Sequence, residues 1–341
     1  MDAGLILPFD GIEPRLGDGT RFLGPGASVL GKVEAGPDTL IAGSAAIRAD
    51  GHFVRIGEGC FFGEASTVHI AQDLYPTIIG DRVTVGRGAV VHACTVGSDC
   101  VIEDNVVILD GSVVEDGVLI EAGSTVFPKS KLDGGFVYAG TPAKAVRAVT
   151  PQEREERGLR LRQAPATLAF LGRQAAEVTA PATAFIARTA RLSGRIELAD
   201  RASVFFGCDF DAGEFRIRIG ERTNIQDNTC IRCEAGETVI GRDTTLGHNV
   251  RLSSCSIGER ALIGIGAVVA AGVAVEDDVM LAAGAVTLPG QRLESGWLWG
   301  GRPARALSRM NEAKRHVMQM IIGHYCGYAE AYARAQEGLR L

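Results

Sequence analysis

Three histidines are the residues in this sequence most able to carry chemistry: His69, His92 and His248. An imidazole can bind a transition metal, act as a general base, or bond to the backbone at a turn. Each of the three lies inside a regularly repeating segment of the chain, so the repeat must determine where its ring points. The remaining histidines are interpreted as solvated or packing residues: His52, His316 and His324.

The eight cysteines are scattered, and one CxxC pair occurs, Cys230 and Cys233. No second pair follows at zinc-finger spacing. Residues three apart on a strand face opposite sides, so these two thiols could share a metal only at a corner. We interpret them as small buried thiols. The sequence contains no P-loop, dinucleotide-binding fingerprint or Gly-x-Ser-x-Gly elbow.

The elements that position the histidines follow from a six-residue period. Between Ile79 and Val126, aliphatic residues recur every six positions, apart from one step of five between Val91 and Val96. Neither an α-helix nor an ordinary strand has this period. A parallel β-helix does, with each hexapeptide forming one side of a three-sided coil and its aliphatic residue pointing inward. Gly, Asn and Asp serve the corners, where φ can be positive.

The same pattern occurs again between Ile240 and Thr287, shifted by 161 residues, and its step of five returns at the same place. Similar segments, AGTPAKAVR and GGRPARALS, follow both series. The chain is therefore a tandem duplication, and its coils resemble the left-handed β-helix of hexapeptide-repeat proteins. We predict a mainly β fold of two tandem left-handed parallel β-helix domains, each followed by an α-helical segment. The predicted boundaries are 1–150 for the first β-helix, 151–184 for a helical linker, 185–310 for the second β-helix and 311–341 for a C-terminal helix.

Helix signals lie after each β-helix. Thr150 is a suitable N-cap, with Pro151 at the first helical position and Glu153 three residues after the cap. The Ala-rich stretch 163–181 is interpreted as helix fragments plus a linker. Near the C-terminus, five residues spaced three or four apart predict one buried helix face: Val317, Ile321, Tyr325, Tyr328 and Tyr332.

Composition limits the possible functions. The net charge is −6 and no basic run is present, which argues against nucleic-acid binding. No segment has the pattern of a signal peptide or 18 consecutive apolar residues, so we expect no membrane association. With 341 residues, each β-helix can bury a core without disulfides, and we expect a cytoplasmic protein with reduced thiols.

Two further segments, GRGAVVHAC (86–94) and GHNVRLSSC (247–255), resemble the γ-class carbonic anhydrase motif Gly-His-four residues-His-Gly-Cys. In that family, three histidines from two neighbouring subunits hold one metal ion. His69 and His92 match the first and third ligand positions, whereas Arg87 stands at the second. In the second half His248 matches the second position, and the first and third carry Arg232 and Ser253.

Other family residues divide between the halves in the same way. Arg48 and Asp50 keep an Arg-x-Asp pattern, for which the second half has Asp211 and Gly213. The second half keeps the family's Asn-Ile-Gln-Asp segment at 224–227, where the first half has Phe-Phe-Gly-Glu. The losses are thus reciprocal.

The resemblance implies a composite site in which His69 and His92 of one β-helix meet His248 of another. Zn²⁺, or Fe²⁺ or Co²⁺, would be the metal, with an open fourth position. The implied reaction is attack of metal-bound hydroxide on CO₂ or a related small electrophile, with Gln226 orienting the water. The expected supporting or interface residues are Arg48, Asp50, Asn224, Asp227 and Arg87. The implied partners are copies of the chain, packed through β-helix faces as a homo-oligomer, and a small-molecule substrate.

Three alternatives remain beside this carbonic-anhydrase-like lyase. Hexapeptide acyltransferases share the coils and the exits around Pro142 and Pro303; they use CoA and a single histidine as general base, here His92 or His248. Their covering loop is longer than the one at 72–76, which argues against this class. The chain could also be a non-catalytic scaffold left by duplication and decay, or a protein that binds an anion through Arg87 or Arg232.

Overall fold

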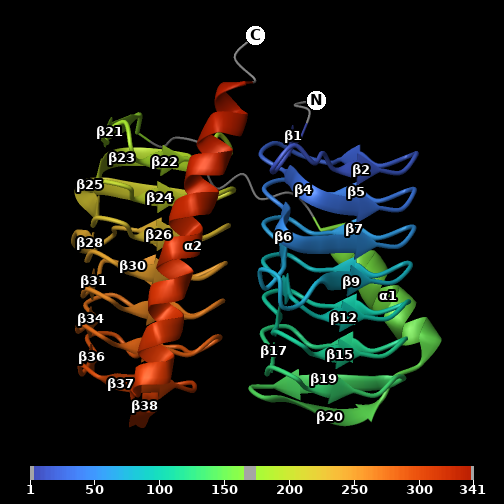
Figure 1. The fold of residues 1–341 in the computed structure, drawn as a ribbon. Helices are drawn as coiled ribbons and strands as arrows, with labels where there is room; N and C mark the ends of the chain where they lie inside the picture. Colours follow the sequence, from blue (N-terminus) through green and yellow to red (C-terminus); the bar gives the residue numbers. More distant parts are fainter. Residues whose placement is uncertain (1–3, 165–173, 339–341) are drawn as a thin grey trace. The chain divides into compact units, whose positions relative to one another are not determined.

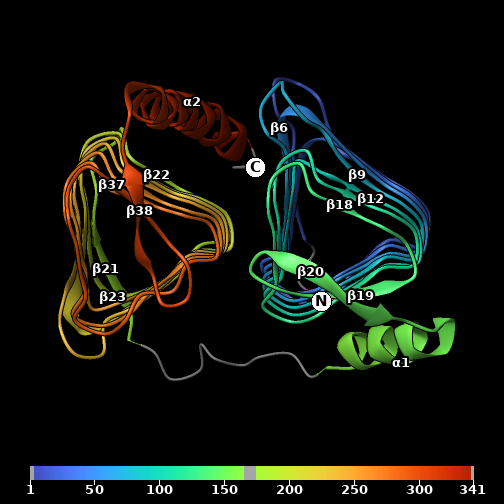
Figure 2. The same cartoon turned by 90° about the horizontal axis from the view of Figure 1, so that it is seen from below.

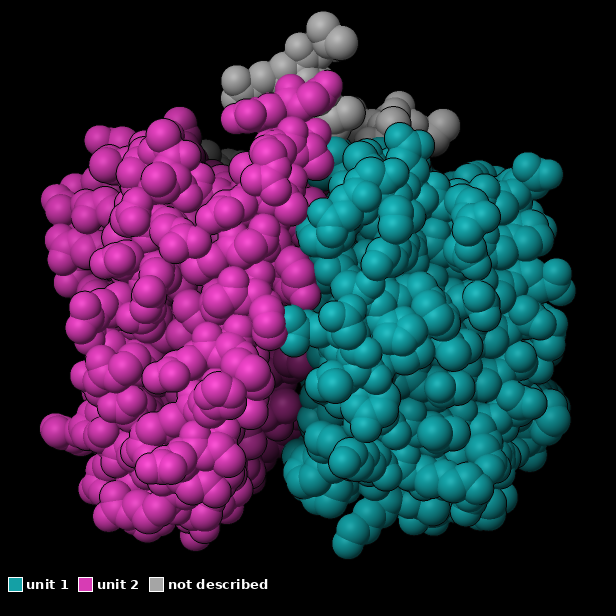
Figure 3. All heavy atoms as spheres, viewed as in Figure 1, with its two compact units in different colours: residues 1–167 teal, residues 168–341 magenta. Residues whose placement is uncertain are grey.

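The structure is a computed structural model that describes residues 4–164 and 174–338. It is mainly β and confirms the predicted fold class of two tandem β-helices (Figure 1). The chain divides into two compact units, Met1–Thr167 and Leu168–Leu341, coloured separately in Figure 3. We call them unit 1 and unit 2 and describe each by itself.

Two sheets form the prism of unit 1. The larger sheet bends around one edge of the prism, because the long strand β6 pairs with β8 on one side and with β9 on the next. The strands of this 12-stranded sheet are β1 (Leu5–Leu7), β2 (Arg15–Leu16), β4 (Ser28–Ala35), β6 (Ala46–Ile56), β8 (Thr67–His69), β9 (Thr77–Ile79), β11 (Val90–His92), β12 (Thr95–Val96), β14 (Val107–Ile108), β15 (Val113–Val114), β17 (Thr125–Val126) and β18 (Lys131–Leu132).

The third side of unit 1 is an eight-stranded sheet made of β3 (Arg21–Phe22), β5 (Leu40–Ile41), β7 (Phe61–Phe62), β10 (Thr84–Val85), β13 (Val101–Ile102), β16 (Leu119–Ile120), β19 (Phe136–Gly140) and β20 (Ala143–Ala148). Its strands are parallel except for the final antiparallel pair of β19 with β20, which ends the stack. The view along the prism in Figure 2 shows the three sides.

Unit 2 repeats this plan. Its larger sheet contains β21 (Ala176–Thr179), β23 (Arg191–Leu198), β25 (Asp209–Ile219), β27 (Cys230–Arg232), β28 (Thr238–Ile240), β30 (Arg251–Ser253), β31 (Ser256–Ile257), β33 (Val268–Val269), β34 (Ala274–Val275) and β36 (Arg292–Leu293). The third side contains β22 (Phe185–Ile186), β24 (Ser203–Val204), β26 (Asn224–Ile225), β29 (Thr245–Leu246), β32 (Leu262–Ile263), β35 (Met280–Leu281), β37 (Trp297–Gly300) and β38 (Arg305–Arg309).

The six-residue period builds the core of each prism. In unit 1, Val85, Ile102 and Ile120 belong to successive coils, lie in register and are fully buried. Burying each such side chain contributes about 1.5–3 kcal/mol. Corner residues such as Asn105 adopt a positive φ, here 57°, which Asn tolerates better than most residues. The period therefore fixes which side chains point inward and which remain on the faces of the prism.

The first helix, α1 (Pro151–Arg162), begins as the capping signals predict. Thr150 is the N-cap, and its hydroxyl accepts a hydrogen bond from the backbone N–H of Glu153. The helix packs on β10 and β13 of unit 1, and its buried residue is Gly158. A Cβ atom at Gly158 would lie 3.4 Å from the hydroxyl oxygen of Thr84, an ordinary contact distance, so this face of the helix lies directly against the sheet.

The interpretation of 163–181 as helix fragments plus a linker is wrong for its described C-terminal part. Residues 176–179 form strand β21, which pairs in parallel with β23 of unit 2. The edge of β23 offers a complete row of backbone partners, and these outweigh the weak helical preference of an Ala-rich segment. Residues 165–173 of the same segment lie outside the described residues.

The C-terminal helix α2 (Glu312–Glu337) has Asn311 as its N-cap. The predicted buried face is confirmed at Tyr325 and Tyr332 but is wrong by part of a turn elsewhere. Val317 is 44% exposed, whereas the buried face carries Met318, Ile322, Tyr325, Cys326, Ala329, Tyr332 and Gln336. Tyr332 is fully buried beside Phe206, with ring centroids 5.1 Å apart. Small Ala329 allows close packing, so the contact stripe passes through it rather than through bulky Tyr328.

Neither helix of the described residues is long and apolar enough to cross a membrane.

Candidate metal centre

His69 and His92 lie side by side in unit 1. His69 ends β8 and His92 ends β11, and the register of these parallel strands pairs the two residues directly. Their side chains therefore leave the same face of the prism, one coil apart. Nδ1 of His69 lies 3.3 Å from Nε2 of His92. His69 is buried and His92 half-buried.

A carboxylate contacts the other ring nitrogen of each histidine. Nε2 of His69 lies 2.9 Å from Oδ1 of Asp50, and Nδ1 of His92 lies 2.6 Å from Oδ1 of Asp110. Arg48 donates to the second oxygen of Asp50, and both of these side chains are completely buried. The Asp110 side chain is 42% exposed. Ionised Asp50 and Asp110 can only accept hydrogen bonds, so they favour an N–H group on the ring nitrogens that they contact.

These contacts fit a divalent metal ion. Two ligand nitrogens of tetrahedral zinc, each about 2.0–2.1 Å from the metal, lie about 3.4 Å apart. The two facing nitrogens of His69 and His92 have nearly this separation. Metal-binding histidines usually donate their other N–H to a carboxylate or carbonyl group. The donor set of unit 1 therefore matches two of the ligands of a zinc-type site.

His248 in unit 2 has the same kind of partner. It lies two residues after the end of β29, and its Nδ1 is 3.1 Å from Oδ2 of Asp227. Both side chains are completely buried. The other oxygen of Asp227, Oδ1, accepts a hydrogen bond from the backbone N–H of Phe206. The aspartate is thus fixed at both oxygens, and Nε2 of His248 is the ring nitrogen directed away from it.

Gln226 is held by a short chain of amides in unit 2. Its Nε2 donates to Oδ1 of Asn224 at 3.2 Å, and Nδ2 of Asn224 donates to the hydroxyl of Thr245 at 2.8 Å. All three side chains are buried. These hydrogen bonds fix the orientation of the Gln226 amide: its nitrogen faces Asn224, and its carbonyl oxygen points away from Asn224.

Salt bridges occupy two of the positions where a ligand histidine is missing. In unit 1, Nε of Arg87 lies 3.3 Å from a carboxylate oxygen of Glu64. In unit 2, Arg232 donates to the carboxylate of Asp209 at 2.7 Å and to its backbone carbonyl, also at 2.7 Å. Both arginines are therefore neutralised by carboxylates, which weakens the idea that either binds an anion.

The buried cysteines are not prepared for metal binding. Cys94 and Cys255 occupy the cysteine positions of the two motifs and point into the prism cores. Burial raises the pKa of the Cys255 thiol to about 12 and that of Cys94 further. Burial also raises the pKa of Cys233 in the CxxC pair. Metals bind the thiolate, which these environments disfavour.

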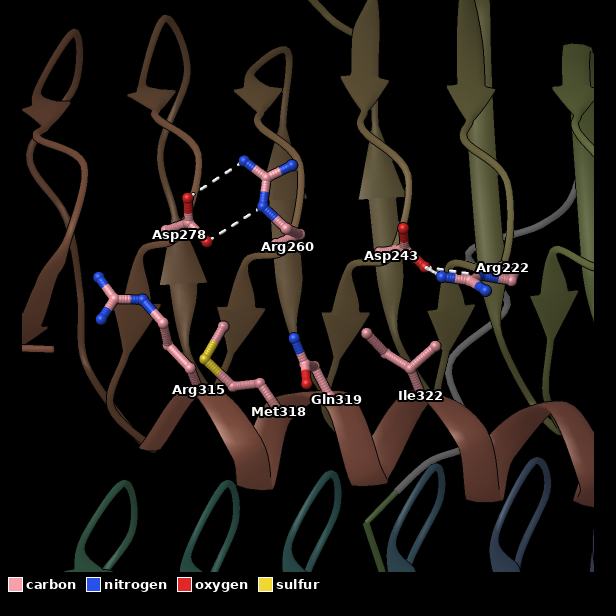
Figure 4. A pocket seen from close by; sticks show the side chains of 8 residues that line it. All are labelled: Arg222, Asp243, Arg260, Asp278, Arg315, Met318, Gln319 and Ile322. Atoms are coloured by element: carbon pink, nitrogen blue, oxygen red, sulfur yellow. Dashed lines mark hydrogen bonds and ion pairs between the residues drawn. The ribbon is translucent and has the colours of Figure 1, made fainter. Parts of the chain in front are cut away.

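A cavity of about 330 Å³ lies between α2 and one corner of the unit 2 prism (Figure 4). Ion pairs dominate its wall. Arg222 contacts Asp243 at 2.7 Å and Arg260 contacts Asp278 at 3.1 Å, as the dashed lines show. These arginines are fully engaged with carboxylates, so we interpret the cavity as part of the helix packing.

The sequence predicts every histidine above, but it does not predict the carboxylate beside His92 or the one beside Arg87. Asp110 was not predicted; it lies one coil after Ala93, the residue next to His92, and contacts the His92 ring from there. Glu64 was noted only as a departure from the family pattern. Asp50 and Asp227 were expected as interface or support residues, and within their units they contact His69 and His248.

Comparisons with known proteins agree with the fold. The family model of bacterial transferase hexapeptide repeats matches residues 93–128, and the model of the hexapeptide repeat of succinyl-transferase matches 53–93 and 255–287. Gamma carbonic anhydrase 1, mitochondrial, of Arabidopsis thaliana is 33% identical over 157 residues, which cover 44% of this chain and 57% of the relative. The chain therefore spans a little over half the length of this plant relative.

Two bacterial proteins are matched over most of their length. Protein YrdA of Escherichia coli is 32% identical over 147 residues, covering 41% of this chain and 80% of YrdA. A solved structure of a hexapeptide transferase family protein from Anaplasma phagocytophilum is 36% identical, covers 46% of this chain and 92% of that chain, and has a TM-score of 0.44. The chain belongs to the hexapeptide-repeat superfamily of γ-carbonic anhydrases and hexapeptide transferases, as a tandem duplicate.

Proposed function

We propose that His69 and His92 of unit 1 and His248 of unit 2 together hold one divalent metal ion, Zn²⁺ or alternatively Fe²⁺ or Co²⁺. Each histidine offers one ring nitrogen. The observation that carries the proposal is the pair of facing nitrogens in unit 1, 3.3 Å apart, with carboxylates on the opposite side of both rings. Unit 1 supplies two ligands and unit 2 the third, in keeping with the reciprocal losses in the sequence.

We further propose that the protein hydrates CO₂ or a related small electrophile, as the similarity to γ-carbonic anhydrases suggests. A bound divalent cation lowers the pKa of water to about 7 and so provides hydroxide at neutral pH. The residues of this chain hold and orient the reactants. The carbonyl oxygen of Gln226, directed by Asn224 and Thr245, accepts a hydrogen bond from the attacking water.

Acyl transfer is the second candidate, because some relatives are described as hexapeptide transferases. The His92–Asp110 contact of 2.6 Å has the form of a general base with its orienting carboxylate. However, Nε2 of His92 faces Nδ1 of His69 rather than an open groove for an acceptor hydroxyl. This geometry favours metal binding over proton abstraction.

Side-by-side packing of β-helices would bring the faces of the two units together, either within one chain or between copies. We therefore propose a homo-oligomer that acts on a small-molecule substrate. Light scattering on a size-exclusion column measures the mass. A mass of two or more times the chain mass of 35.9 kDa supports the homo-oligomer. A mass of one chain refutes it, and the metal site would then have to form within that chain.

The function is tested by CO₂ hydration, followed in a stopped-flow pH-indicator assay after loading with Zn²⁺ or Co²⁺. We expect catalysis by the unmodified protein and its loss in His69→Ala, His92→Ala and His248→Ala. His52→Ala is the control, because His52 lies in β6 outside the three-histidine set. Catalysis that survives all three substitutions, or metal-loaded protein with no catalysis, would refute the proposed reaction. Saturable CoA binding would then favour acyl transfer.

A further inference from the structure

Asp110 contacts His92 in a way that selects one ring nitrogen. Its Oδ1 lies 2.6 Å from Nδ1 of His92. An ionised carboxylate is an acceptor only, so a neutral His92 must carry its proton on Nδ1. The lone pair of that ring then lies on Nε2, which is the nitrogen facing His69. Without this carboxylate, the neutral ring could place its proton on either nitrogen.

The duplication provides an internal comparison for this contact. The position of His92 corresponds to Ser253 in unit 2, and the position of Asp110 corresponds to Ala271. Where the histidine is absent, the carboxylate is absent too. The coil geometry at this corner does not itself require an aspartate, since unit 2 forms the same coil with Ala271.

Asp50 shows the opposite selection at His69. It contacts Nε2 of His69, which leaves Nδ1 directed toward His92. The equivalent residues of unit 2 are Gly213 and Arg232, so this carboxylate and its histidine are also lost together. The Asp50 side chain is completely buried with Arg48, whereas that of Asp110 is 42% exposed. Substitution of Asp110 therefore tests whether a carboxylate selects the ligand nitrogen, with less risk to folding than substitution of Asp50.

We propose that Asp110 is a positioning residue for metal binding: it fixes His92 as the Nδ1–H tautomer so that Nε2 is the ligand atom, while Asp50 fixes His69 to bind through Nδ1. This inference rests on the proposed metal site. Asp110 contributes no ligand atom itself, because its Oδ1 accepts a hydrogen bond from Nδ1 of His92, on the side of the ring opposite Nε2. The two histidines of unit 1 thus use different ring nitrogens.

Metal affinity gives the first test. Co²⁺ binding to the full chain is measured by competition with a chromophoric chelator, for the unmodified protein, Asp110→Ala and Asp110→Asn. Loss of such a carboxylate partner typically weakens metal binding about 10–100-fold, and we expect this range for Asp110→Ala. Asp110→Asn keeps an acceptor oxygen but loses the charge, so the Co²⁺ affinity of this variant should lie between those of the unmodified protein and Asp110→Ala. Asp133→Ala is the matched control, an exposed aspartate of the same unit in contact with Lys131.

The second test needs no metal. Nitrogen-15 NMR of the histidine rings in metal-free protein reports which nitrogen carries the proton, with His92→Gln used to assign the signal. We expect the Nδ1–H form for the unmodified protein and Asp110→Asn, and a shift toward Nε2–H in Asp110→Ala. Unchanged Co²⁺ affinity or an unchanged tautomer in Asp110→Ala would overturn the proposal. If the unmodified protein binds no metal, the proposed function fails, and the tautomer still decides whether Asp110 positions the ring.

Discussion

The two halves of the chain have the same coils but keep different residues of the proposed metal site. Unit 1 holds His69 and His92, each beside an aspartate, and unit 2 holds His248 beside Asp227. The pair Asp227–His248 corresponds in unit 1 to Glu64–Arg87, a salt bridge at the same two positions. A carboxylate–histidine pair and a carboxylate–arginine pair thus replace each other without a change of fold.

The ion pairs explain why the coils tolerate these losses. A carboxylate that remains near a buried face requires a positive partner. Arg87 supplies this charge to Glu64, and Arg232 supplies it to Asp209. A guanidinium group stays protonated at all relevant pH values and cannot bind a cation. In the proposed site, each half therefore has one region that would hold a metal and another in which a fixed cation would exclude it.

The largest expected effect of a single substitution concerns the buried ion pair of unit 1, which has no equivalent in unit 2. Arg48→Met removes the guanidinium partner of the completely buried Asp50, which keeps the contact with the His69 ring described above. Leaving one charge of a buried pair uncompensated typically costs about 3–5 kcal/mol. Chemical denaturation measures the change in the free energy of unfolding. A loss below 1 kcal/mol, similar to that of the exposed control Arg55→Ala, would show that Asp50 is not held as a buried anion.

Matched core positions compare the two prisms directly. Ile102 of unit 1 and Ile263 of unit 2 occupy equivalent coil positions and are both fully buried. Replacing either by alanine should lower the free energy of unfolding by about 2–5 kcal/mol, because each change leaves a cavity in a packed core. Thermal unfolding followed by circular dichroism measures both variants. A large effect at one position only would show that the prisms are not equivalent in packing.

The sequence predicted the cores of both prisms, but it did not predict all of the elements that pack on the outside of the prisms. The six-residue period determines the coils because every inward position is filled by a side chain such as Ile102, whatever else the chain does. Part of the buried face of α2 was predicted wrongly because more than one set of residues spaced three or four apart could form that face. Only the packing shows that Ala329 rather than Tyr328 is buried against the prism. Strand β21 was missed because its pairing with β23 is a tertiary effect.

For the candidate site, the residues could be predicted but not all of their contacts. The spacing places His69 and His92 in adjacent coils, so their proximity follows from the repeat. Asp110 could have been predicted from its place one coil after Ala93, the residue next to His92. The proposed sharing of one metal ion by His248 and the other two histidines cannot be derived from any repeat, because it would depend on how separate β-helices pack.

A smaller effect is expected for the salt bridge at the altered ligand position. The Arg87 side chain is 40% exposed, so Arg87→Ala should lower the free energy of unfolding by no more than about 1 kcal/mol. It should leave the metal content unchanged, because Arg87 belongs to no metal site in this account. Denaturation and elemental analysis check both statements. A loss of metal equal to that of His92→Ala would contradict the division of the halves.

The smallest effect concerns charges at one prism corner, where Arg82 and Asp99 of unit 1 correspond to Asp243 and Arg260 of unit 2 with the signs reversed. The hydrogen bond from Arg82 lowers the pKa of Asp99 in the folded protein. Its stabilising contribution is therefore present above the unfolded pKa and is lost as the pH falls through the folded value. Both side chains are about half exposed, so the effect is small.

The pH dependence is checked by comparing the unmodified protein with Asp99→Asn between pH 7 and pH 3. The difference in stability should be constant at neutral pH and disappear in acid. A difference that grows as the pH falls would have the wrong sign for this ion pair.

The central claim is that ligands from both units form one metal site. The most direct measurement is the metal content per chain of the unmodified protein, His92→Ala and His248→Ala, purified without chelators and reloaded with Zn²⁺. The account predicts that substitution in either unit abolishes the same bound metal. Metal retained at the unmodified level in His248→Ala, or protein that cannot be loaded at all, would contradict it.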